Sequence, residues 1–139
     1  MNADGGDTRL VFGDRAMSVD PAWSPDGKSI VFANDREDGR VGNFELFSVS
    51  VDGGPEQRLT HRSRFDVEPV VSPDGKRIAF VSNGDGNPEI YLMNADGSGV
   101  LRLTRDPGND YYPHWSPDGK KLIFTSNRDG KYALYEIDI

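Results

Sequence analysis

The sequence contains no cysteine, so it has no disulfide framework, and cysteine usage says nothing about its redox compartment. No apolar run approaches the roughly 20 residues that a membrane helix needs, which argues against membrane insertion. Basic residues are outnumbered, 16 against 23 acidic ones, and the net charge of −7 would repel nucleic acid. No segment has the i, i+3, i+4 apolar stripe of an amphipathic helix. The expected fold class is therefore all-β.

Repetition is the main feature that is present. The pentapeptide SPDGK occurs at Ser24–Lys28, Ser72–Lys76 and Ser116–Lys120, with spacings of 48 and 44 residues. A proline-containing segment precedes each copy (DPAW, EPVV, YPHW), and an apolar segment follows it (SIVFAN, RIAFVSN, KLIFTSN). A polar turn and another apolar segment come next, and R-L-T follows in the first two copies. The chain is therefore built from three repeats of one structural unit.

Each repeat is predicted to form four short antiparallel strands. In S-P-D-G, proline presets φ for the first central turn position and glycine takes the positive φ that follows, as in a tight hairpin. The second strand, at Ile30–Ala33, Ile78–Val81 and Leu122–Thr125, is apolar at nearly every residue, which indicates burial on both faces. Four strands per repeat, in sheets covered on both sides, predict the blades of a β-propeller. Trp23 and Trp115 are expected to fill the gaps between blades.

The repeat resembles that of the TolB-type propeller family. The resemblance rests on DYYPHWSPDGKKLIFTSNRDG at Asp110–Gly130 and PEIYLMNADGSGVLRLT at Pro88–Thr104, and it covers essentially the whole chain. The sequence departs from the pattern at Val71, which replaces the tryptophan, and at Ser18, which replaces the leading aspartate. The resemblance implies a propeller, often six-bladed, of a periplasmic or secreted bacterial protein. It also implies a binding or assembly role without catalysis.

The repeats are out of phase with the two ends of the sequence. Met1–Gly5 repeats Met93–Gly97, and Arg9-Leu10 matches Arg102-Leu103, so residues 8–12 are predicted to be an outer strand. Propellers need about four to eight blades to close a ring. We therefore expect a homodimer that forms a six-bladed ring by strand exchange, with residues 8–12 of each copy completing the last blade of the other. The three blades then span about residues 20–60, 66–104 and 110–139, and the last lacks its own outer strand.

Other origins of the pattern stay open. The sequence is a natural full-length protein, a fragment of a longer propeller whose other half supplies the partner arc, or an engineered half-propeller. No basic start and apolar segment precede Asp4, so no signal peptide is expected, and the compartment is unassigned except through the resemblance.

No catalytic centre is recognisable. The sequence has no G-x-S-x-G elbow and no phosphate-binding glycine loop, and its two histidines are His61 and His114. We expect His61 in a solvated loop, while His114 lies on a predicted innermost strand and could face the central channel. A zinc or manganese site usually needs three or more protein ligands, which the local spacing does not supply. The expectation is a protein that is not an enzyme and holds no cofactor or metal.

The candidate binding site lies where the innermost strands begin. In a propeller these strand starts gather around one mouth of the central channel, and a rim of carboxylates and aromatic rings suits a cation, a basic peptide or a sugar. A structural role competes with this one, in which the leading aspartates Asp66 and Asp110 cap the loops between blades. The candidate residues are Asp20, Asp66, Glu68, Asp110, Tyr111, Tyr112 and His114.

The function predicted from these features is a non-catalytic module for protein or peptide binding, or for assembly. The alternative is a propeller with a metal or carbohydrate site at the central channel, similar to sugar lyases or accessory to a hydrolase. A lyase needs a cluster of histidines, and a peptidase needs an α/β-hydrolase domain for which these 139 residues have no room. The expected partners are a second copy of the chain and a protein or peptide ligand.

Overall fold

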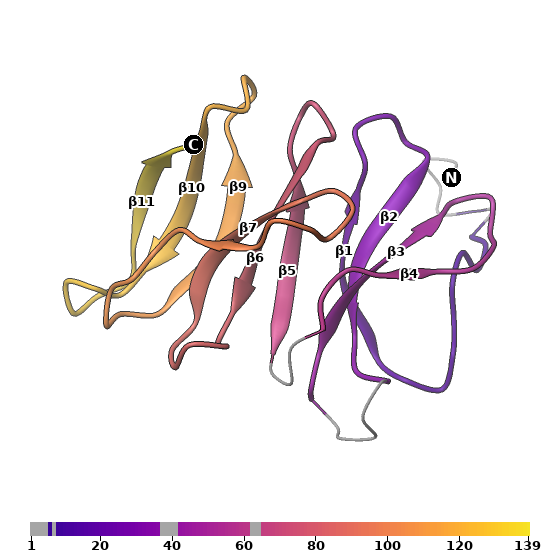
Figure 1. Ribbon diagram of the computed structural model, residues 1–139, viewed down its shortest axis with the longest axis horizontal. Coiled ribbons are helices and arrows are strands. Elements are labelled where there is room, and N and C mark those ends of the chain that lie inside the picture. Colours follow the sequence, from indigo (N-terminus) through magenta and orange to yellow (C-terminus); the bar gives the residue numbers. More distant parts are fainter. Residues whose placement is uncertain (1–5, 7, 37–41, 62–64) are drawn as a thin grey trace.

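The structure is a computed structural model that describes residues 6, 8–36, 42–61 and 65–139. These residues form three antiparallel sheets, which stand side by side in sequence order (Figure 1). We call them blade 1 (β1–β4), blade 2 (β5–β8) and blade 3 (β9–β11). The strands are β1 (Ser18–Trp23), β2 (Ser29–Asn34), β3 (Glu45–Ser50), β4 (Gln57–Arg58), β5 (Asp66–Val71), β6 (Arg77–Ser82), β7 (Glu89–Asn94), β8 (Leu101–Arg102), β9 (Asp110–Trp115), β10 (Lys121–Ser126) and β11 (Ala133–Asp138).

Each blade begins with a hairpin at its S-P-D-G turn, as predicted. In all three copies the serine hydroxyl donates a 2.6 Å hydrogen bond to the aspartate, and the lysine backbone N–H donates to the same carboxylate. These bonds, the serine's first, lower the pKa of Asp26, Asp74 and Asp118. The glycine of each turn has a positive φ of 69° to 73°, which glycine adopts without the penalty of a Cβ. The turn is therefore fixed by its own five residues.

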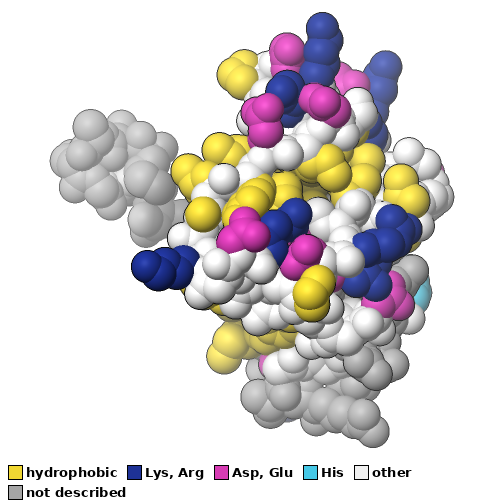
Figure 2. All heavy atoms as spheres, turned by 90° about the vertical axis from the view of Figure 1, so that its left-hand side faces the viewer, with side chains coloured by type: hydrophobic (Ala, Val, Ile, Leu, Met, Phe, Trp, Pro, Cys, Tyr) yellow, Lys and Arg dark blue, Asp and Glu magenta, His cyan; other side chains and the backbone are white. Residues whose placement is uncertain are grey.

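Burial on both faces holds for the middle strands of blades 1 and 2. In β6 only Arg77 is not fully buried, because blade 1 covers one face of blade 2 and blade 3 covers the other. In β10 the side chains alternate, and Ile123 is 41% exposed. The prediction is wrong for this strand because one face of blade 3 has no sheet against it among the described residues. That face is turned toward the viewer in Figure 2, where apolar side chains lie exposed between charged ones.

The tryptophans differ in the same way. Trp115 is half-buried between blades 2 and 3, where its indole N–H donates to the carbonyl oxygen of Val70 at 3.1 Å. The guanidinium of Arg77 lies 5.1 Å from the centroid of the Trp115 ring. Trp23, at the same position of blade 1, is 62% exposed. The expected gap-filling role is thus confirmed for Trp115, whereas no blade packs against Trp23 among the described residues.

Residues 8–12 do not form a strand in the described chain. Val11 and Phe12 pack instead against the outer face of blade 1, with the Phe12 and Phe32 ring centroids 4.8 Å apart. No described strand lies beside the free edge of β11, at the opposite end of the arc (Figure 1). The exchange predicted for residues 8–12 requires a second chain and stays a prediction. The matching motif at residues 1–5 lies outside the described residues.

Among the residues that the structure describes, no helix has the length and apolar character needed to cross a membrane.

Candidate binding site at the inner strands

One residue at the same position in each inner strand adopts the left-handed backbone conformation. Asp20 in β1, Glu68 in β5 and Tyr112 in β9 have φ values of 51°, 52° and 56°, and each stands directly before a proline. At these positions the pairing with the next strand shifts register, as it does at a β-bulge. Left-handed conformations are costly for residues other than glycine and are found preferentially at functional sites. The three residues are therefore the first candidates for a site.

Hydrogen bonds join these positions from blade to blade. The backbone N–H of Glu68 donates to Oδ2 of Asp20 at 3.3 Å. The backbone N–H of Tyr112 donates to Oε2 of Glu68 at 2.5 Å. Each carboxylate thus accepts from the left-handed residue of the following blade, so the inner edges of all three blades are tied together. A carboxylate can accept more than one hydrogen bond, so both groups could also accept from a ligand.

The carboxyl group of Glu68 has a raised pKa. Its partial burial is the largest cause, and the negative charge of Asp20 acts in the same direction, while the N–H of Tyr112 opposes them. Burial also raises the pKa of the Tyr111 hydroxyl, with smaller contributions from Tyr132, Glu68 and Tyr112. A site that disfavours added negative charge in this way would be stabilised by a bound cation. Burial is the largest cause of the raised pKa of Glu68, so a bound cation would offset only the smaller contribution from the negative charge of Asp20.

A pocket of about 320 Å³ lies next to Tyr112. Three tyrosines surround it together with one carboxylate, and Tyr112 and Tyr132 are 61% and 59% exposed. The rings of Tyr111 and Tyr112 are tilted by 41° with centroids 6.0 Å apart. Tyrosine faces attract cations, more strongly where the cation is desolvated. The pocket is lined by Glu68, Tyr111, Tyr112, Thr125 and Tyr132.

Two of the predicted rim residues are not at the rim. Asp66 and Asp110 are 0% exposed. Their backbone N–H groups donate to carbonyl oxygens of the preceding blade, those of Phe44 and Pro88, and the Asp110 carboxylate is paired with Arg128 at 2.9 Å. Their burial argues against a place on the exposed rim, because they stand where the inter-blade connection enters the sheet. Their structural role is the one that the structure supports.

His114 is also displaced from the predicted site. It is exposed, and it pairs in register with Ile123 on the open face of blade 3. Side chains of a regular strand alternate between the two faces of its sheet. Only the residues at a bulge can point away from both faces, toward the inner edge of the sheet. His61 is exposed beside a second pocket of about 200 Å³ that Asp66 also lines. No three His, Cys, Asp or Glu residues in the described part of the chain are placed to share a metal ion.

A buried polar cluster in blades 1 and 2 was missed by the sequence analysis. Glu89, at the start of β7, is 0% exposed, accepts from the hydroxyl of Thr104 at 2.5 Å and is paired with Arg102 at 2.7 Å. Blade 1 has the same arrangement of Glu45, Thr60 and Arg58. The signal was present as a glutamate that begins the third strand and R-L-T that ends the fourth. The cluster locks the outer strand onto the blade.

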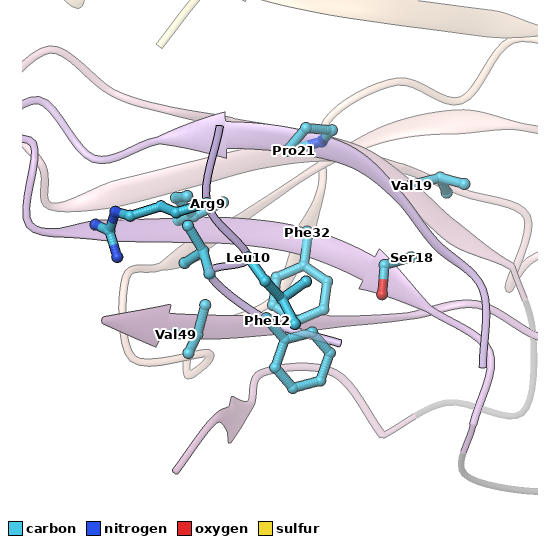
Figure 3. Close-up of a pocket in the computed structure, with 10 residues that line it drawn as sticks. Arg9, Leu10, Phe12, Ser18, Val19, Pro21, Phe32 and Val49 are labelled. Carbon is cyan, nitrogen blue, oxygen red and sulfur yellow. The ribbon is translucent and has the colours of Figure 1, made fainter. Parts of the chain in front are cut away.

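A further pocket of about 220 Å³ opens on the outer face of blade 1. Figure 3 shows Phe12 lying against Phe32, with Leu10 and Arg9 on the same segment. Leu10 is 81% exposed even though it lines this pocket. Residues 9–12 therefore cover the end face of the arc only loosely.

Comparison with known proteins places this architecture in a family. The profile of the tricorn protease N-terminal β-propeller domain matches residues 41–139. The structure of TolB from Acinetobacter baumannii is similar over 99% of this chain, with 33% identity and a TM-score of 0.82. The putative TolB from Agrobacterium tumefaciens is similar over 88% of the chain, with 34% identity and a TM-score of 0.78. The chain belongs to the TolB-like β-propeller family.

The chain spans only part of these relatives, 33% of the Acinetobacter TolB chain and 46% of the Agrobacterium one. An oligogalacturonate lyase in complex with manganese is also similar over 91% of this chain, with a TM-score of 0.72. At 17% identity that likeness shows the fold alone.

Proposed function

We propose that this TolB-like propeller arc is a non-catalytic module that binds a protein or peptide segment carrying basic side chains. The observation that carries the proposal is the line of Asp20, Glu68 and Tyr112 along the inner edges of three successive blades. Two carboxylates and exposed aromatic rings in one line offer ion pairs and cation–π contacts to lysine or arginine. The net charge of −7 draws a basic partner toward the surface.

The backbone of this line is set before any ligand arrives. The three left-handed residues are held by bulges, by the prolines that follow them and by the hydrogen bonds between blades. A preorganised edge loses little conformational entropy on binding. This is a reason to expect that the strained conformations serve recognition rather than folding.

The proposal includes a closed ring made by two copies of the chain. Blade 3 has an open apolar face and a free edge, and blade 1 has an end face covered only by residues 9–12. Exposed apolar faces and unpaired strand edges are liabilities that proteins normally cover. Two arcs of three blades give the six-bladed number expected from the family resemblance, and the two inner edges would then face one channel.

Titration of a labelled octalysine peptide into the protein, followed by fluorescence anisotropy at low salt, tests the binding role. We expect E68Q to weaken binding about fivefold or more, because one charge-assisted contact is lost. The control is D52N, which removes the same charge from an exposed turn between β3 and β4. Absence of binding by the wild type would overturn the proposal. Equal weakening in both variants would show that only the net charge matters, and would overturn it as well.

A further inference from the structure

The outer strand of a complete blade is fastened by a matched set of polar side chains. In blade 2 the Thr104 hydroxyl accepts from the N–H of Ile90 at 2.9 Å and donates to Glu89, which Arg102 also contacts. Glu89 and Thr104 are both buried, so removing either side chain leaves a polar group of the other unsatisfied. A glutamate on the third strand therefore requires a threonine on the fourth.

Blade 3 has no such glutamate on its third strand, β11. The position of Glu45 in β3 and Glu89 in β7 is taken in β11 by Ala133, which is exposed in this chain. A threonine on the outer strand of blade 3 would find no carboxylate on β11 to accept its hydroxyl hydrogen. The strand that completes blade 3 is thus expected to carry an apolar residue in place of threonine.

The chain contains a segment of that description. Arg9-Leu10-Val11 repeats Arg58-Leu59-Thr60 and Arg102-Leu103-Thr104, with valine at the threonine position. The glutamate and the threonine are therefore replaced together, and replacing both members of a buried polar pair by apolar groups is far less costly than replacing one. Val11 packs on blade 1 and Ala133 begins β11 of blade 3, and these two blades stand at opposite ends of the arc (Figure 1). They do not meet in this structure.

We infer that residues 8–12 of one copy form the outer strand of blade 3 in a second copy, with Val11 packed on Ala133. This inference rests on the proposed ring and adds the residues that specify its junction. Val11 also excludes the wrong pairing, because beside β3 or β7 it would leave Glu45 or Glu89 without its hydroxyl partner. The matched apolar pair therefore directs the segment to β11 alone.

Charge and exposure agree with this placement. In blade 2 Arg102 lies 3.8 Å from Asp85, whose carboxylate accepts from the hydroxyl of Tyr91. In blade 3 Asp129 takes the place of Asp85, and its carboxylate accepts from the hydroxyl of Tyr135 in the same way. Asp129 is therefore positioned to form an ion pair with Arg9 of the second copy. The leucine of the motif is 3% exposed at Leu59 but 81% exposed at Leu10. Exchange would bury Leu10 as Leu59 is buried.

The segment is held only weakly where it lies in the single chain. Arg9 donates to the carbonyl oxygen of Val51 at 2.8 Å, and Val11 and Phe12 pack on blade 1, but residues 8–12 pair with no strand (Figure 3). In the ring, the face they cover meets blade 3 of the second copy. Release of the segment and docking of the second copy are therefore one event.

The test uses two single variants and their mixture, with masses measured by sedimentation velocity and native mass spectrometry. In a dimer of V11T, a threonine faces alanine at both junctions. In a dimer of A133E, a buried carboxylate faces valine at both junctions. Each variant should weaken its own dimer about tenfold or more. In the heterodimer that the mixture forms, one junction carries both substitutions, with threonine opposite glutamate, and the other keeps the unchanged Val11–Ala133 pair. The heterodimer should therefore make up a larger share of the dimers than random pairing of the two variants would give.

Each outcome decides something different. Both residues are accessible in the single chain, so the variants should fold, and circular dichroism checks this. A wild-type protein that keeps the mass of one chain at all concentrations overturns the ring itself, while binding by Glu68 is judged by the peptide titration. A wild-type dimer that V11T and A133E leave unchanged, or a mixture without excess heterodimer, overturns the exchange and leaves the dimer standing.

Discussion

The indole N–H of Trp115 donates to the backbone carbonyl of Val70 across the junction between blades 2 and 3. Arg77, on blade 2, covers the same ring. This contact shows how the blades of the arc adhere, because a single large side chain contributes apolar area, a hydrogen bond and a cation–π contact at once. The matching residue of blade 1, Trp23, makes no such contact with the residues that the structure describes and is 62% exposed.

Replacing Trp115 by alanine should lower the free energy of unfolding by about 3 kcal/mol, because a large cavity opens at the junction. W23A is the matched control and should change it by less than about 1 kcal/mol while the protein is a single chain. Urea unfolding monitored by circular dichroism measures both. Equal losses in the two variants would contradict a special role of the Trp115 junction.

The polar cluster of blade 2 gives a second prediction. E89A leaves the Arg102 guanidinium and the Thr104 hydroxyl without their buried partner, so the free energy of unfolding should fall by about 3 kcal/mol. The double variant E89A/T104V reproduces the Ala133–Val11 combination; it removes the orphaned hydroxyl but also the acceptor of the Ile90 N–H, so its loss should be smaller than the sum of the losses of E89A and T104V. Urea unfolding of the four proteins in the cycle supplies the coupling. Strictly additive losses would count against the matched pair.

Turn chemistry made much of the fold predictable from the sequence. S-P-D-G sets φ locally, so the three hairpins and the sheets that follow them could be placed without knowledge of tertiary contacts. The exposure of Ile123 could not be predicted in this way, because it depends on whether another sheet packs against blade 3. Local pattern therefore predicted strands well and their neighbours less well.

The candidate site was only partly predictable for the same reason. Glu68 and Tyr112 were included because they belong to the strand starts, but so were Asp66 and Asp110, two residues earlier in each strand. A bulge with a left-handed residue decides which of them reaches the edge, and nothing in Asp, Glu or Tyr announces that conformation as glycine would. The left-handed residue stands directly before a proline in all three strands, but the hydrogen bonds that join these positions from blade to blade became visible only in the structure.

The raised pKa of Glu68 predicts a specific dependence of stability on pH. A carboxyl group with a folded pKa above its unfolded value binds more protons in the folded state, so it destabilises the fold as pH rises through that range. The difference between E68Q and wild type in free energy of unfolding should therefore shift in favour of E68Q as the pH rises above the ordinary pKa of glutamate. Urea unfolding at several pH values measures it.

The control for this pH series is D118N. Hydrogen bonds from Ser116 and from the Lys120 N–H lower the pKa of Asp118, so its contribution is present above the unfolded pKa and is lost as pH falls. The two variants should therefore deviate from wild type with opposite slopes. Parallel slopes would show that the environment of Glu68 does not favour its protonated form.

Gly97 and Gly53 hold the same position in blades 2 and 1, and both have a φ of 88°. A Cβ on Gly53 would meet nothing within 4 Å, whereas one on Gly97 would stand 2.6 Å from the backbone oxygen of Leu59. G53A should therefore cost about 1–2 kcal/mol of unfolding free energy through backbone strain alone. G97A should cost about 1–3 kcal/mol more, because the outer strand of blade 1 must move away from blade 2. Urea unfolding of the pair separates strain from steric overlap, and equal losses would mean that Leu59 yields freely and that the outer edges of blades 1 and 2 are not tightly packed.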